Sequence, residues 1–132
     1  MAIGYFSSYL SKAIMDHILK VTPFVAPDHL YVALSTTDPG EAGAGITEPV
    51  AMGYVRVICD DWTVASDSTG TNTSDITFPA STGLWGTIAY FAVFDALTGG
   101  NQLFYGPVDI SRLVQSGDTA VFYAGNFVVL LD

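Results

Sequence analysis

Residues 82–106, TGLWGTIAYFAVFDALTGGNQLFYG, decide the fold of this chain. The segment contains one acid and no base, histidine or cysteine. Residues 87–95 alternate with Ile88, Tyr90, Ala92 and Phe94 on one side and Ala89, Phe91 and Val93 on the other. Because both sides are apolar, the pattern predicts a central strand that is covered on each face. Gly99 and Gly100 can adopt positive φ, so they predict a hairpin turn before LFYG, with Pro107 ending the returning strand.

On the N-terminal side, residues 5–23, YFSSYLSKAIMDHILKVTP, have a helical pattern. Ser7 or Ser8 is expected to cap the helix, and the Val-Thr-Pro sequence is expected to end it. Asp16 precedes Lys20 by four residues, which is the favourable order for an ion pair on a helix. One face is apolar, because suitable side chains recur three and four positions apart: Phe6, Leu10, Ala13, Ile14, His17 and Ile18.

The rest of the chain has the period-two pattern of strands, separated by loops rich in glycine, proline and small polar residues. Strands are predicted in HLYVALST, GYVRVICDDWTV and ITFP, and three more after Pro107, with a Ser-Gly-Asp turn and a break near residues 125–126. Residues 38–49 and 65–75 are predicted loops. Seven or eight short strands predict a mainly β fold, an antiparallel β-sandwich of the jelly-roll or immunoglobulin-like type with one N-terminal helix. We expect a single domain over residues 1–132, with a helical arm over 1–22 and the sandwich over 23–132.

The composition argues against several classes of partner. Only 13% of the 132 residues are charged, against about 25% in an average domain, and 50% are hydrophobic. The net charge is −9, and the cations are Lys12, Lys20, Arg56 and Arg112. So few cations argue against binding to nucleic acid or to an anionic membrane. No secretory signal and no membrane span are predicted, so the chain is expected to be made in a cytosol.

No catalytic residue is predicted. There is no Gly-x-Ser-x-Gly turn, and the two imidazoles have structural interpretations: His17 packs on the helix face and His29 stabilises a turn before a strand. Asp60 and Asp61 are adjacent, point to opposite faces if the strand continues, and are expected to be solubilising charges. The single Cys59 excludes an intramolecular disulfide and is expected in the core.

No cofactor or metal is predicted either. The glycine-rich stretches LTGGN and STGTN lack the Gly-Lys-Ser/Thr ending of a phosphate-binding loop. Two polar loops offer oxygen ligands for calcium, but neither has EF-hand spacing, and turn formation is the preferred interpretation. The oxygen-bearing side chains that these loops offer are Asp38, Glu41, Asp67, Asn72, Thr73 and Asp75.

Five segments, in this order, resemble a family of small virion proteins of tailed bacteriophages, whose members are tail-fibre-like or minor structural proteins. They are SSYLSKAIMDHIL, PDHLYVALSTTDPGEAGAGITEP, GYVRV, ITFPASTGLWGTIAYFAVFDALTGGNQLFYGPV and SGDTAVFYAGNFVVLLD. The sequence departs from the family pattern at Cys59 and Asp60-Asp61, where apolar or threonine-rich strand residues are expected. The positions that carry the resemblance are Asp16, His17, Asp38, Pro39, Glu48, Gly53, Tyr54, Arg56, Val57, Trp85, Gly86, Asp95, Gly99, Gly100, Asn101, Gly117 and Asp118.

The resemblance implies a non-enzymatic assembly subunit of the tail, baseplate or fibre base, assembled into the virion in the host bacterial cytoplasm. Other virion proteins and further copies of the chain, as a trimer or hexamer, are the expected partners. The apolar helix is expected to contact a neighbouring subunit, with residues 38–49 and 66–75 facing outward. A head decoration protein, a carbohydrate-binding module contacting host-surface glycans and an envelope hydrolase are alternatives. The aromatic residues considered for stacking on sugars are Tyr54, Trp62, Trp85 and Tyr105.

Overall fold

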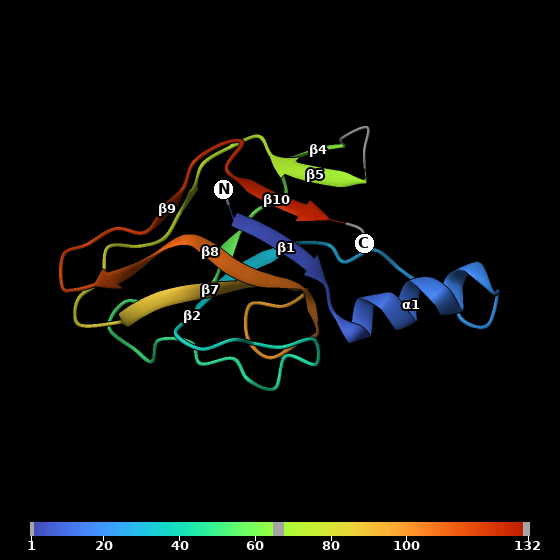
Figure 1. Ribbon diagram of the computed structural model, residues 1–132, viewed down its shortest axis with the longest axis horizontal. Coiled ribbons are helices and arrows are strands. Elements are labelled where there is room, and N and C mark those ends of the chain that lie inside the picture. Colours follow the sequence, from blue (N-terminus) through green and yellow to red (C-terminus); the bar gives the residue numbers. More distant parts are fainter. Residues whose placement is uncertain (1, 65–67, 131–132) are drawn as a thin grey trace.

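A computed structural model gives the positions of residues 2–64 and 68–130 (Figure 1). These residues form a mainly β fold with one helix, as the sequence predicts. The helix is α1 (Ser8–Ile18), and within the described residues no helix has the length and apolar character needed to cross a membrane. The strands are β1 (Ala2–Phe6), β2 (Tyr31–Ser35), β3 (Val57–Ile58), β4 (Trp62–Val64), β5 (Thr69–Asn72), β6 (Ile76–Thr77), β7 (Gly86–Phe94), β8 (Gln102–Val114), β9 (Val121–Phe122) and β10 (Phe127–Leu130).

Eight strands form one curled sheet in the order β3-β2-β7-β8-β1-β10-β5-β4, and β6 pairs with β9 in a second, two-stranded sheet. The ring centroids of Phe91 on β7 and Phe127 on β10 lie only 4.4 Å apart. These strands are three positions apart, a distance of about 14 Å in a flat sheet. The sheet therefore curls so that its two halves enclose a shared core, an arrangement compatible with the expected sandwich. Most pairs are antiparallel, but β1 and β10 are parallel.

Strand β7 is central, as predicted, and both its faces are covered. Phe91 is fully buried in the main core, whereas Phe94 is 6% exposed and packs on the other face with Ala33 and Ala92. The predicted grouping of Ile88 with Phe94 is wrong, because Ile88 belongs to the Phe91 cluster. A register shift between Ile88 and Tyr90 turns the first part of the strand over.

The prediction that Pro107 ends the returning strand is also wrong, because β8 continues to Val114. Pro107 lies opposite Tyr90, and the next paired residue of β8 is Arg112, opposite Ile88. Residues 108–111 thus form a wide bulge beside a single residue of β7. Proline is tolerated at bulges, where a ladder hydrogen bond is already missing.

The N-terminal segment differs from the expectation in its first residues. Residues 2–6 form β1, which lies between β8 and β10 near the middle of the sheet, so the helix begins only at Ser8. Ser7 is the N-cap, and its Oγ accepts a hydrogen bond from the Leu10 amide, as one of the two predicted caps. The predicted Asp16–Lys20 pair is replaced by Lys12–Asp16, because Lys20 lies beyond the helix with φ 62°.

Two further segments depart from the expectation. The predicted strand over GYVRVICDDWTV is split into β3 and β4. Alternation along one strand would place Tyr54 and Cys59 on opposite faces, but both pack against the same core. The predicted loop over residues 65–75 contains β5, although residues 65–67 lie outside the described part of the chain. Its pairing with both β4 and β10 explains this strand, because its own sequence is small and polar.

The buried centre of β7 predicts the effect of shortening one side chain. Phe91→Ala is expected to lower the free energy of unfolding by about 3–5 kcal/mol, because the ring is fully buried among aromatic neighbours. Urea denaturation measures this loss. Leu84→Ala, at a side chain that is 65% exposed, is the matched control and should change stability by less than about 0.5 kcal/mol. Equal small losses in both variants would contradict the central position of β7.

Candidate functional site

The strongest polar cluster in the described residues joins Glu48, Tyr54 and Arg56, and its role is structural. Both carboxylate oxygens of Glu48 accept hydrogen bonds from Arg56, at 2.9 and 2.8 Å, and the Tyr54 hydroxyl donates a third at 2.6 Å. Arg56 Nη1 also donates to the carbonyls of Ala96 and Gly99 in the β7–β8 turn. Every polar group in this cluster is therefore bound to another part of the same chain.

The titration of this cluster follows from its contacts. Burial alone would raise the pKa of Glu48, but the hydrogen bonds from Arg56 and Tyr54 outweigh it and leave the pKa below its ordinary value. Burial and the neighbouring carboxylate raise the pKa of Tyr54. The cluster thus holds a fixed carboxylate and a neutral phenol near neutral pH, which suits a structural ion pair.

The two histidines have separate structural contacts. The prediction that His17 packs on the apolar face of the helix is wrong, because its side chain is exposed. Its Nδ1 accepts a hydrogen bond from the Phe24 amide. This bond holds the chain reversal after α1. His29 Nδ1 lies 2.6 Å from the Asp60 carboxylate, so it ties the start of β2 to the end of β3. The hydrogen bond from His29 lowers the pKa of Asp60.

The acids considered for catalysis or calcium make hydrogen bonds within the fold. Asp60 also accepts the Leu30 amide, and Asp61 accepts the Ser74 hydroxyl, so both are more than the solubilising charges expected. The other polar side chains with such contacts are Asp38 to the Gly40 amide, Asn72 to the Ser74 and Tyr123 carbonyls, and Asp75 to the Ala124 amide. In residues 2–64 and 68–130 no group of three or more metal-ligating side chains is present; Asp67 lies outside these ranges.

The side chains considered for sugar stacking do not form an exposed row. Trp85 is 5% exposed, as a core residue, and its Nε1 donates to the Met52 carbonyl. Trp62, Tyr54 and Tyr105 are half-buried. Cys59 is buried, as predicted, and burial raises the pKa of its thiol to about 11.

A first exposed apolar surface lies at the free end of the helix. We call it the helix tip, defined as Met15, Ile18, Leu19, Val21 and Val25, whose exposed fractions run from 54% to 82%. Among the residues of α1 only Leu10 is buried, although Ile14 and Ala13 are half-buried. Figure 1 shows α1 projecting from one end of the sheet, away from both sheet faces. The tip is therefore apolar surface that its own domain does not cover.

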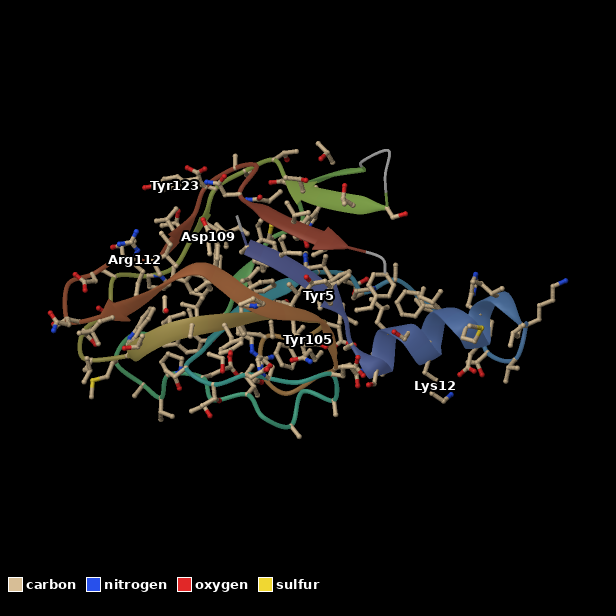
Figure 2. All side chains as sticks on the ribbon, viewed as in Figure 1. Tyr5, Lys12, Tyr105, Asp109, Arg112 and Tyr123 are labelled. Carbon is tan, nitrogen blue, oxygen red and sulfur yellow. The ribbon has the colours of Figure 1, made fainter. Side chains whose placement is uncertain are left out.

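A second surface is a hollow of about 550 Å³ between the bulged part of β8 and residues 118–126. Its exposed apolar rim consists of Ile110, Leu113 and Tyr123, which are 61%, 52% and 61% exposed. Asp109, Arg112 and Asp118 are the charged side chains that line it. In Figure 2 the labelled Asp109, Arg112 and Tyr123 lie toward the end of the molecule opposite Lys12 on the helix.

The sequence predicted the first surface but not the second. The wide apolar arc of the helix is visible in residues 5–19, whereas the hollow depends on a bulge at the point where the sequence predicts that Pro107 ends the strand. The available signal was Val108, Ile110 and Leu113, apolar residues interrupted by Asp109 and Arg112, which suit neither a buried strand nor a polar loop.

A β-rich domain with two apolar surfaces, and with its described polar clusters bound internally, is the kind of protein that builds assemblies, as virion structural proteins do. A family model described as Podophage GP4 fiber I protein gp80 matches residues 5–129. Because the match covers nearly the whole sequence, the chain belongs to this family of phage fibre proteins, and the resemblance to virion proteins is confirmed. No curated protein matches the chain.

The Glu48–Arg56 pair predicts a pH-dependent loss of stability. Glu48→Gln is expected to lower the free energy of unfolding at neutral pH by about 3–5 kcal/mol, because it leaves the Arg56 guanidinium buried without its anion. The folded pKa of Glu48 is lowered, so its contribution is present above the ordinary value of 4.5 and is lost as the pH falls through the folded value. Urea denaturation at neutral pH and at about pH 3 measures the free energy of unfolding of both proteins. The difference between parent and variant should be smaller at the lower pH. A gap of the same size at both pH values would contradict this role.

Proposed function

We propose that this chain is a non-enzymatic assembly subunit at the base of a bacteriophage fibre, where it connects the fibre to the tail. The family supports a structural role in the virion, as a fibre component. The single observation that carries the proposal is the exposed apolar helix tip on a rigidly placed helix. A chain that diffused freely would gain nothing from this surface, whereas an assembly subunit covers it with a neighbour.

The interior of the molecule supports a structural role over catalysis. Among the described residues, His17 and His29 lie on different elements and contact the backbone of a chain reversal and the carboxylate of Asp60. The Glu48 and Asp60 carboxylates have lowered pKa values and are anions near neutral pH, which does not suit a general acid. The sequence and these contacts together favour a structural role for the polar side chains over a catalytic one.

A fibre base is favoured over two alternatives. The aromatic residues that the sequence offers for stacking on sugars, Tyr54, Trp62, Trp85 and Tyr105, are buried or half-buried, which argues against a host-glycan module built on them. A head decoration protein would suit the same apolar helix, but the family description names a fibre protein. Assembly in the host bacterial cytoplasm and a closed trimer or hexamer are part of the proposal.

Imaging of intact particles tests the position. We expect an antibody fragment against the chain to decorate purified virions at the tail, and cryo-electron microscopy to place its density where fibres join. A matched particle with a stop codon early in the gene should lose this density and its fibres while keeping a filled head. Decoration spread over the head would replace the fibre-base proposal with head decoration, and absence from purified particles would overturn the virion role.

The two imidazoles supply a separate test of the non-enzymatic role. His17→Ala with His29→Ala is expected to lower thermal stability by a few degrees, because it removes one backbone contact and one partly exposed pair. Neither the parent nor the variant should release reducing sugars from bacterial envelope polysaccharides. Hydrolysis by the parent that disappears in the double variant would overturn this prediction.

A further inference from the structure

We propose that copies of this chain assemble head to tail, with the helix tip of one copy inserted into the hollow of the next. This inference rests on the proposed assembly function and specifies its contact. The hollow offers about 550 Å³, an apolar floor that includes Leu34 and Ile88, and the exposed rim of Ile110, Leu113 and Tyr123. A helix end with apolar side chains on several sides fits such a depression, as in helix-in-groove recognition.

The positions of the two surfaces favour a head-to-tail contact. They lie toward opposite ends of the molecule, as the labelled Lys12 and the labelled Arg112 and Tyr123 show (Figure 2). A tip cannot reach the hollow of its own chain, because α1 projects away from the sheet (Figure 1). Two different surfaces at two ends make a heterologous contact, which either closes into a ring or continues as a filament.

Charge favours the same contact over pairing of two helix tips. Residues 8–25 carry Lys12 and Lys20 against one acid, Asp16, whereas the rest of the chain carries twelve acids and two arginines. Arg56 is buried against Glu48, so it adds little to the surface potential. The hollow is lined by two acids, Asp109 and Asp118, and one cation, Arg112, so a tip that enters it brings Lys20 toward a surface where acids outnumber cations. Two tips packed on each other would instead bring basic helices together.

Point variants test the contact better than a truncation does. Removing residues 1–20 would delete β1 from the middle of the sheet and unfold the domain. Ile18→Glu changes the tip at a side chain that is 64% exposed, and Leu113→Glu changes the rim of the hollow. Val50→Glu, at a side chain that is 86% exposed and in neither surface, is the matched control.

Complementation of the two variants gives the decisive result. In analytical ultracentrifugation, each variant alone should associate at least about tenfold more weakly than the parent and the control. Their mixture should form a one-to-one dimer that does not grow, because one intact tip meets one intact hollow. A Leu113→Glu variant that associates like the parent would overturn the proposal in favour of tip-to-tip pairing. Parental association in both variants, or a parent that stays monomeric at high concentration, would also overturn it.

Disulfide trapping gives a second measurement that does not depend on how the charged variants fold. Leu19→Cys with Ile110→Cys should form ladders of linked chains under mild oxidation, whereas each single variant should not. The buried Cys59, with its raised pKa of about 11, contributes little background. Linkage by Leu19→Cys alone would indicate paired tips and contradict head-to-tail contact. A chain that forms these ladders but is absent from virions would retain the contact and overturn only the proposed function.

Discussion

The ion pair between Glu48 and Arg56 is the interaction on which the organisation of the sheet depends. The guanidinium contacts four groups. It donates hydrogen bonds to the Glu48 carboxylate and to the carbonyls of Ala96 and Gly99, and it lies over the ring of Phe94, whose centroid is 3.8 Å away. One side chain therefore joins the long loop after β2 to the β7–β8 turn and to the second face of β7. Tyr54 extends the contact to β2, because its hydroxyl accepts the Leu34 amide and donates to Glu48. These links replace the ladder hydrogen bonds that the irregular segment between β2 and β3 lacks.

This use of Arg56 has a consequence for the surface. The chain has four cations, and one of them, Arg56, is buried in the ion pair with Glu48. Both lysines lie on α1 or just after it, whereas Arg112 is exposed at the opposite end of the molecule, beside Asp109 and Asp118. The helix end is therefore the part of this acidic molecule where cations outnumber acids. Acidic bodies repel one another at the distances found in an assembly, and an oppositely charged element is what can bridge them. Because Arg56 is neutralised inside the fold, the two lysines supply most of the positive charge that remains at the surface.

The parts of the fold that the sequence could predict are those that local chemistry determines. Three features could be predicted because each depends on a few neighbouring residues. They are the two glycines at the β7–β8 turn, the apolar alternation in β2 and β7, and the Ser7 cap. Strand β1 could not be predicted in this way, because Phe6 also fits the helical spacing. The strand forms through pairing with β10, at the other end of the chain. Strand β5 has no apolar pattern and is fixed by its two neighbours. Likewise the hollow arises from a bulge whose cause is the register with β7, which no short stretch of β8 encodes.

The junction of β1 and α1 explains how an exposed helix can keep one direction. Ser7 follows β1 directly; its amide donates to the Leu103 carbonyl, its hydroxyl donates to the Gln102 carbonyl and it also accepts the Leu10 amide. The next residue, Ser8, donates its amide to the Glu41 carbonyl, so the first turn is bound to β8 and to the loop after β2. Because β1 lies near the middle of the sheet, the helix inherits its orientation from the most protected part of the fold. A helix fixed in this way would lose little conformational entropy on being covered by a partner, as the proposed contact between copies requires.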